Sequence, residues 1–151
     1  MNAVDIMSKN VITVSDDSSI EQLAEILIKN NVSGVPVVDD DNRVIGIVTE
    51  KDIMYKNSEP RFPAAAQILG AQIYLGGVKK YNAQLKKIIA TSVRELMTKD
   101  VITVHEDDAI KTVVDLMLKH NINRIPVLDK NDRLCGIISR ADIVKNIAQA
   151  I

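Results

Sequence analysis

Apolar and polar residues follow one another along this chain in a pattern that occurs twice. Each copy opens with a short run of β-branched residues, Val11–Val14 and Val101–Val104, which predicts a short strand. Next comes a stretch with apolar residues at helical spacing, which predicts a helix packed on one face. The apolar positions are Ile20, Leu23, Ala24 and Leu27 in the first copy and Ile110, Val113, Val114 and Met117 in the second.

The polar residues around each expected helix predict where it begins and ends. Ser18 and Glu21 have the spacing of a capping box, in which two side chains satisfy free backbone N–H groups at a helix start. The helices are expected to end at Asn30-Asn31 and His120-Asn121, because asparagine tolerates the left-handed conformation that commonly follows a helix.

Two further strands and a second helix complete each copy. The strands are expected at Val35–Val38 and Val44–Val48, and again at Ile125–Leu128 and Leu134–Ile138. Acidic and amide residues between the two strands predict a turn, so that each pair forms a hairpin. The last helix is expected to begin at Thr49 in the first copy and at Ser139 in the second.

The two copies align without a gap at a constant offset of 90 positions, from residues 7–53 to residues 97–143. Such self-similarity indicates duplication of one supersecondary unit that cannot bury its apolar face alone. We therefore predict an α/β (α+β) fold of two β-α-β-β-α repeats packed as a pseudo-two-fold pair. The expected boundaries are 1–57 for the first repeat, 58–90 for a helical segment between the repeats, and 91–151 for the second repeat.

The segment between the repeats has helical patterning of its own. Ala64–Leu75 is apolar and helix-compatible, and Val78–Ala90 has the spacing of an amphipathic helix. The segment either packs the two halves together or forms a dimer contact, or else it is an interaction surface particular to this protein. The pairs Lys79-Lys80 and Lys86-Lys87 are interpreted as a solvated helix face.

Composition and charge narrow the class of protein. The chain has 151 residues, of which 46% are hydrophobic and 26% charged, and its net charge is −1. These values fit a globular protein, and neither a nucleic-acid nor a membrane partner is expected, since both favour excess Lys and Arg. The N-terminus lacks the pattern of a signal peptide. The single cysteine, Cys135, lies in an apolar run and is expected to be a buried, unreactive thiol. With neither a signal peptide nor an apolar run long enough to span a bilayer, we expect a cytoplasmic location.

The candidate chemistry lies in a pattern that recurs where a strand meets the last helix. Thr49 and Asp52 have their equivalents in Ser139 and Asp142. A helix N-terminus favours a phosphate, a hydroxyl can bond one of its oxygens, and a carboxylate can accept hydrogen bonds from a ribose diol. The same spacing also forms a capping box that only closes the helix. No catalytic residues and no metal site are expected, because neither nucleophile motifs nor metal-ligand spacings occur.

These motifs together resemble those of CBS domains over residues 1–57 and 91–151. The shared features are the Val-Ile-Thr-Val run, the helix, the Pro-Val-(Val/Leu)-Asp strand, and the final Gly-x-x-(Ser/Thr)-x-x-Asp motif. The resemblance implies a CBS pair, or Bateman module, which in that family binds adenine nucleotides or adenosyl compounds such as AMP, ATP or S-adenosylmethionine. It implies such a regulatory ligand, with AMP or ATP favoured, and no cofactor.

The resemblance also implies which residues hold the ligand. Asp52 and Asp142 fall on the ribose-binding aspartate, and Thr49 and Ser139 on the phosphate-facing hydroxyl. The remaining implied binding residues line the base and phosphate: Thr13, Val14, Ser33, Gly34, Val35, Pro36, Thr103, Val104, Asn123, Arg124, Ile125 and Pro126. In the family, the aspartate of one repeat is paired with the proline loop of the other.

The two implied clefts differ in charge. Arg124 stands at the position that Gly34 occupies in the first repeat, and a guanidinium can clamp a phosphate through two hydrogen bonds. We expect the cleft with Arg124 to prefer a phosphorylated ligand and the cleft with Gly34 to bind a less charged one, to bind more weakly, or to stay empty. Alternatively, Arg124 is a surface residue paired with a neighbouring acid.

Two functions remain open at this point. The first is a regulatory module that senses an adenosine-containing molecule and shifts between conformations. Because the chain has no room for an attached enzyme, channel or transporter, its output is expected to pass through an unknown client protein, a homodimer or the central segment. The second is a structural or dimerisation scaffold whose clefts bind nothing. A catalytic role is the weakest of the three classes that we considered.

Overall fold

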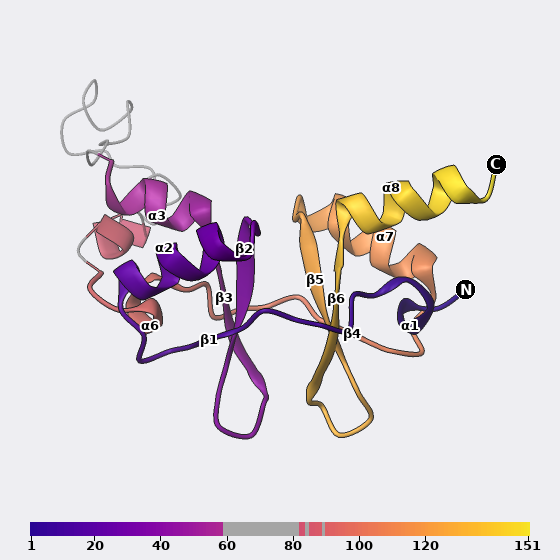
Figure 1. Cartoon of the computed structure of the whole chain (residues 1–151), viewed down its shortest axis with the longest axis horizontal. Coiled ribbons are helices and arrows are strands. Elements are labelled where there is room, and N and C mark those ends of the chain that lie inside the picture. The colour runs from indigo at the N-terminus through magenta and orange to yellow at the C-terminus, as the bar shows by residue number, and fades with distance from the viewer. Residues whose placement is uncertain (59–81, 84, 89) are drawn as a thin grey trace, which may run out of the picture. The chain divides into compact units, whose positions relative to one another are not determined.

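Two three-stranded sheets, each with its own helices, make up the part of the chain that the computed structural model describes, residues 1–58, 82–83, 85–88 and 90–151 (Figure 1). The elements of the first repeat are α1 (Ala3–Ile6), β1 (Val14–Ser15), α2 (Ile20–Lys29), β2 (Gly34–Val38), β3 (Val44–Thr49) and α3 (Glu50–Lys56). Those of the second are α6 (Val93–Leu96), β4 (Val104–His105), α7 (Ile110–His120), β5 (Arg124–Leu128), β6 (Leu134–Ser139) and α8 (Arg140–Gln149). The predicted α/β fold class and the β-α-β-β-α order are confirmed.

The middle strand of each sheet is the one that contains the proline. The strand orders are β1-β2-β3 and β4-β5-β6. β4 pairs with β5 in parallel, with Val104 opposite Val127, and β6 pairs with β5 in antiparallel fashion. Each first strand is shorter than predicted and lies later, because only the last residue of the Val-Ile-Thr-Val run joins the ladder. One more pair would place Thr103 opposite Pro126, which has no N–H to donate.

The first long helix begins one residue later than the sequence suggested. The N-cap of α2 is Ser19 instead of Ser18, and its hydroxyl accepts a hydrogen bond from the Gln22 N–H at 3.1 Å. Gln22 Oε1 accepts one in return from the Ser19 N–H at 2.9 Å. A glutamine closes a capping box as a glutamate does, so Gln22 takes the role predicted for Glu21.

Left-handed residues mark equivalent bends in the two repeats. Asn31, which follows the C-cap Asn30 of α2, and Asn121, the C-cap of α7, both have φ of 50°, which confirms the predicted asparagine ends. In the hairpin turns, Asn42 and Asp132 both have φ of 60°. Asparagine and aspartate tolerate this conformation better than most residues, so the same bends recur without glycine.

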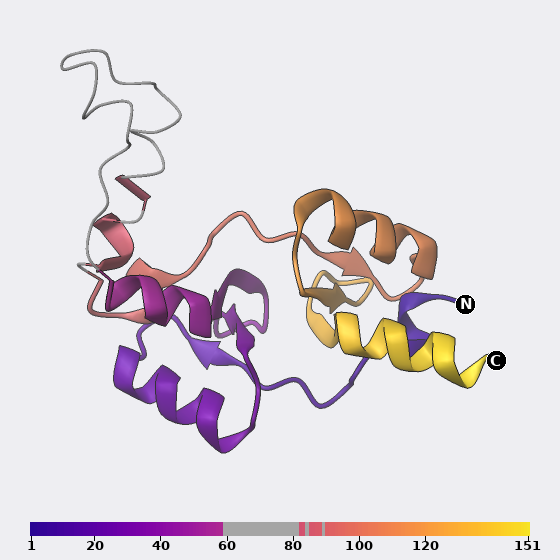
Figure 2. The same cartoon turned by 90° about the horizontal axis from the view of Figure 1, so that it is seen from above.

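The chain divides into two compact units that cross the repeat boundaries. One unit comprises residues 1–14, 36–47 and 99–151, and the other comprises residues 15–35 and 48–98. Each repeat begins with a short helix, α1 or α6, which we call its leading helix. α1 belongs to the unit that contains α7 of the second repeat, and α6 belongs to the unit that contains α2 of the first. In Figures 1 and 2 the indigo N-terminal segment with α1 lies beside the yellow α8, which it contacts.

Backbone hydrogen bonds hold the two leading helices, and they are equivalent under the 90-residue shift. They run from Ala3 N–H to Asp108 O (2.8 Å), from Val4 N–H to Glu106 O (2.9 Å), from Val93 N–H to Ser18 O (2.9 Å) and from Arg94 N–H to Asp16 O (2.9 Å). Arg94 Nε also pairs with Asp16 Oδ2 at 2.8 Å. Each leading helix thus adds to its unit through main-chain bonds that do not depend on side-chain type.

The leading helices also complete the cores of their units. Ala3 of α1 is fully buried in a cluster of second-repeat residues, namely Val104, Val113, Met117, Ile125, Val127 and Ile138. In the other unit, Val93 and Leu96 of α6 are fully buried. Burial of apolar surface contributes most of the stability of a small domain, so each unit relies on residues that the sequence assigns to the other repeat.

Gly136 of β6 lies directly against Met7 of the N-terminal segment. A Cβ at this position would lie 2.3 Å from Met7 Sδ and 3.0 Å from Met7 Cβ. We expect Gly136→Ala to lower the free energy of unfolding by about 1–3 kcal/mol, the usual cost of overpacking. Urea denaturation measures this change. Because the clash is with Met7, the cost should shrink in a Met7→Ala background, and an equal cost in both backgrounds would show that Met7 is not responsible.

Part of the expected central segment lies outside the described residues. This applies to all of the predicted helix at Ala64–Leu75 and to the first residues of Val78–Ala90. Residues 82–83 and 85–88 are helical. Near the end of the segment, Lys56 Nζ donates to the carbonyl oxygens of Ile88 and Ala90, so this part is tied to α3. Within the described ranges, the helices are too short or too polar to cross a bilayer.

Candidate functional site

The predicted aspartate of the first repeat lies in the first turn of α3, directly after β3. Asp52 Oδ2 accepts hydrogen bonds from the Thr49 backbone N–H at 2.9 Å and from Thr49 Oγ1 at 3.4 Å. The carboxylate therefore closes a capping box on the residue that ends the strand. This contact fixes the direction in which the side chain leaves the helix.

The second repeat reproduces this arrangement with tighter bonds. Asp142 Oδ2 accepts from the Ser139 N–H at 2.7 Å and from Ser139 Oγ at 2.8 Å. Ser139 Oγ in turn accepts from the Asp142 N–H at 3.2 Å. Two independent copies of one sequence pattern thus give one carboxylate geometry.

Capping, one of the two interpretations of this motif, is what both aspartates do in the structure, and the Ser139 hydroxyl also accepts a helix N–H. Thr49 and Ser139 are engaged with their own aspartates, so their expected role toward phosphate remains a prediction. The cap uses only Oδ2 of each aspartate. Since a carboxylate has acceptor positions on both oxygens, capping leaves Oδ1 able to accept hydrogen bonds from a second group. The two interpretations are therefore compatible.

The two aspartates differ in burial and in what meets Oδ1. Asp52 is 6% exposed, and among the residues that the structure describes it is the one charged residue that is buried. Asp142 is half-buried. Lys87 Nζ forms an ion pair with Asp52 Oδ1. A buried carboxylate is stable when it is paired, and Lys87 supplies that partner. Among the residues that the structure places, Asp142 has no basic partner.

The loop before each proline is tied to the start of the last helix of the same repeat. The Glu50 N–H donates to Ser33 O at 2.8 Å, and the Arg140 N–H donates to Asn123 O at 3.0 Å. Each aspartate is thereby brought near the predicted loop of its own repeat. The pairing of an aspartate with the loop of the other repeat, which the family resemblance implies, remains a prediction.

The other predicted binding residues range from exposed to fully buried. Ser33 and Asn123 are exposed, and Thr13, Thr103 and Arg124 are half-buried. The buried members of the set are Val14, Gly34, Val35, Pro36, Val104, Ile125 and Pro126. The buried members can meet a ligand mainly through backbone groups, whereas Arg124, the first residue of β5, lies opposite Ser139 in the ladder.

Lys87 is the residue of this region that the sequence interpretation missed. The pair Lys86-Lys87 was expected to be a solvated helix face, and Lys86 is indeed exposed. The Lys87 side chain is 23% exposed and reaches Asp52. The amphipathic spacing of Val78–Ala90 gave a weak indication of this difference, because successive helix positions such as Lys86 and Lys87 point in different directions.

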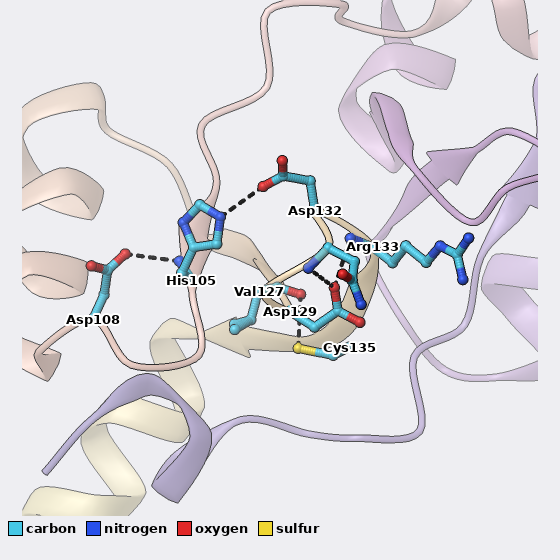
Figure 3. A network of polar contacts seen from close by, with 8 residues as sticks. His105, Asp108, Val127, Asp129, Asp132, Arg133 and Cys135 are labelled. Carbon is cyan, nitrogen blue, oxygen red and sulfur yellow. Dashed lines mark hydrogen bonds and ion pairs between the residues drawn. The ribbon is translucent and has the colours of Figure 1, made fainter.

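A second set of polar contacts lies at the hairpin of the second repeat (Figure 3). Asp129 Oδ1 accepts from the Asn131 and Arg133 N–H groups at 2.8 and 3.1 Å, and these bonds hold the pKa of Asp129 below its usual value. Cys135 is half-buried, and its Sγ lies 3.4 Å from Val127 O. Burial, followed by the charge of Glu106, raises the pKa of the Cys135 thiol, which disfavours the reactive thiolate.

The histidine in this set is paired with an acid. His105 Nε2 lies 2.8 Å from Asp132 Oδ1 (Figure 3), and this hydrogen bond raises the pKa of His105. The contribution of this pair to stability is therefore fully present at pH values below the unfolded-state pKa of His105, about 6.5. It is lost as the pH rises through the higher pKa that His105 has in the folded state. The described residues form no cluster of His, Cys, Asp and Glu suited to a metal ion.

We expect Asp132→Asn to lower the pKa of His105, because the substitution removes the carboxylate that favours the imidazolium. The backbone should tolerate the change, since the equivalent residue Asn42 adopts the same φ of 60°. An NMR titration of the His105 ring in both proteins measures the shift. An identical titration midpoint in the variant would show that Asp132 does not set the His105 pKa.

Comparison with known protein families places both repeats in one family. The CBS domain model matches residues 3–59 and 93–149. Among curated proteins, the chain is 30% identical over 148 residues to protein MJ1426 of Methanocaldococcus jannaschii, covering 93% of this chain and 88% of that protein. It is also 35% identical over 139 residues to the L-aspartate semialdehyde sulfurtransferase of the same organism, covering 92% of this chain but only 22% of the enzyme.

Solved structures share the architecture over the full chain. The CBS domain pair of protein MJ0100, in complex with 5′-methylthioadenosine and S-adenosyl-L-methionine, is 30% identical with a TM-score of 0.74, covering 100% of this chain and 98% of that one. CBSX2 in complex with AMP has a TM-score of 0.81 at 22% identity, covering 99% of this chain and 97% of that one. The latter similarity establishes the shared fold alone.

Proposed function

Because the chain belongs to the CBS-domain family, we propose that it is a regulatory module that binds an adenosine-containing molecule and passes the binding event to another protein. The observation that carries this proposal is the repeated carboxylate, Asp52 and Asp142, oriented by the same cap in both repeats. A carboxylate held in this way can accept hydrogen bonds from both hydroxyls of a ribose. The MJ0100 domain pair, which is similar over its whole length, holds two adenosyl compounds.

The ligand class that we propose is AMP, ATP or an adenosyl compound such as S-adenosylmethionine. Asp52 and Asp142 would bind the ribose, and the loops at Ser33–Pro36 and Asn123–Pro126 would meet the base and phosphate with their backbone groups. Arg124 would add a positive charge for a phosphate. No cofactor is part of this proposal, since the adenosine compound acts as the signal.

A regulatory role is favoured over a catalytic one by the variety of relatives. The chain covers only 22% of the sulfurtransferase and 23% of an inosine-5′-monophosphate dehydrogenase from Methanocaldococcus jannaschii, which is 30% identical over 143 residues. The same module therefore accompanies enzymes with unrelated activities. A module shared in this way is better explained by regulation than by one common reaction, and we propose an unknown client protein and a cytoplasmic location.

We further propose that the module forms a homodimer through its helices. Large apolar side chains are exposed at equivalent positions: Ile28 (81%) of α2 and Leu118 (72%) of α7, and Met54 (70%) of α3 and Val144 (65%) of α8. Large apolar side chains exposed on helices are candidates for protein contacts. Their recurrence under the 90-residue shift gives each repeat the same exposed apolar helix positions, which supports contact with a second copy of the same chain.

A thermal-shift series with nucleotides tests the proposed function. AMP, ATP, 5′-methylthioadenosine and S-adenosylmethionine are compared with 2′-deoxy-AMP, which lacks one hydroxyl of the diol. A ligand at 100 times its Kd is expected to stabilise the fold by about 2.7 kcal/mol, and the deoxy compound should stabilise it less at equal concentration. The scaffold alternative predicts no shift with any of them, and that result would overturn the proposal.

A further inference from the structure

Lys87 occupies the oxygen of Asp52 that the helix cap leaves open. Asp52 Oδ2 is bonded to Thr49, while Oδ1 is paired with Lys87, a residue from the stretch between the repeats. The pair is well shielded, with side-chain exposures of 8% for Asp52 and 23% for Lys87. A ribose diol that binds Asp52 through both oxygens must therefore share Oδ1 with Lys87 or displace it.

A second lysine stands close to the same place. Lys87 Nζ and Lys51 Nζ each lie 5.9 Å from the centroid of the Tyr55 ring. The ring attracts both cations, and a single carboxylate, Asp52, is paired with one of them. The cluster of Lys51, Asp52, Tyr55 and Lys87 therefore has more positive than negative charge.

The second repeat offers an internal comparison. Asp142 has the same cap, but the residues equivalent to Lys51 and Tyr55 are Ala141 and Lys145. In the part of the chain that the structure describes, Asp142 Oδ1 meets neither a lysine nor an arginine side chain. The two aspartates thus have the same orientation and different electrostatic surroundings.

We propose that Lys87 makes the Asp52 site selective for adenosyl ligands that carry a phosphate over those that carry none. The inference rests on the proposed function of Asp52 in binding ribose. An uncharged nucleoside that reaches Oδ1 leaves the Lys87 ammonium in a half-buried place without an anion, which opposes binding. A phosphorylated ligand supplies an anion to which the ammonium, with three N–H donors, can turn. Lys87 therefore weakens binding of adenosine and strengthens binding of AMP.

Calorimetric titration with AMP and adenosine tests this selectivity. Asp142→Asn is used as the background, so that the Asp52 site is measured by itself. In that background Lys87→Met is expected to lower the ratio of AMP to adenosine affinity by about tenfold, the effect of losing one charge-assisted hydrogen bond. Lys86→Met, which changes an exposed neighbour, should leave the ratio unchanged, and Lys87→Arg should retain most of it.

The outcomes separate this proposal from the function on which it rests. If the wild-type protein binds AMP but Lys87→Met keeps the wild-type ratio, Lys87 does not set the selectivity and only this proposal is overturned. Loss of all binding in the Asp142→Asn background would also overturn it, because the Asp52 site would then take neither ligand. If the wild-type protein binds no adenosine compound at all, both proposals fail. Thermal unfolding of each variant identifies any loss of folding, and Lys87→Arg keeps the charge beside Asp52 in case Lys87→Met does not fold.

Discussion

Leu96→Ala is expected to lower the free energy of unfolding by about 3 kcal/mol, within the range for truncating a buried leucine. Leu96 is fully buried, although it lies on α6, a helix of only four residues. In sequence this helix begins the second repeat, while its backbone is bonded to Asp16 and Ser18 of the first. Leu96 comes from the second repeat, but it packs in the unit that contains α2 of the first repeat. The substitution therefore removes part of the core of that unit.

Chemical denaturation of the wild type and the variant measures this change. Leu118→Ala is a matched control, because Leu118 is 72% exposed and its truncation should change stability by less than about 0.5 kcal/mol. Equal effects at the two leucines, or a decrease of under about 1 kcal/mol in the free energy of unfolding for Leu96→Ala, would contradict the packing of α6 into the core beside the first repeat. Such a result would mean that α6 contributes little to the core.

The second large effect is expected on ligand affinity. Replacing both Asp52 and Asp142 with asparagine should weaken binding of AMP by about 100-fold or more, since two hydrogen bonds to a charged acceptor are lost at each site. Asparagine has nearly the same shape, so the helix cap can be kept while the charge is removed. Each single variant should lose one of the two sites and leave the other.

Calorimetry gives both the affinity and the number of ligands bound per chain. Asp115→Asn is the control, because Asp115 is an exposed carboxylate on α7 that takes part in neither cap. Unfolding measurements on the same proteins show whether the substitutions destabilise the fold, which is a concern at Asp52 because its ion pair with Lys87 is buried. Undiminished AMP binding in the folded double variant would show that the aspartates do not hold the ligand.

The local elements of the fold were predictable because their causes lie within a few residues. β-branched runs and helical spacing located the strands and helices, and Asn31 and Asn121 marked helix ends. Where two neighbouring residues could play one role, the sequence did not decide between them, as with Ser18 and Ser19 at the start of α2. The length of β4 could not be predicted, because Pro126 limits the ladder only when it stands opposite the neighbouring strand.

The candidate site was predictable in part. The repeated motif located Asp52 and Asp142, and the structure gives them the same cap. The partner of Asp52 was not predictable, because Lys87 is 35 residues away and looks like any lysine on an amphipathic helix. The packing of α1 and α6 on the opposite repeats was missed for the same reason, since a short helix has no sequence feature that names its distant partner.

A crystal structure of the protein with bound AMP would show whether the two aspartates hold the ribose. We predict that ribose hydroxyls lie within hydrogen-bonding distance of Oδ1 of Asp52 or Asp142, with Oδ2 still bonded to the capping residue. A nucleotide bound elsewhere, with both carboxylates untouched, would contradict it.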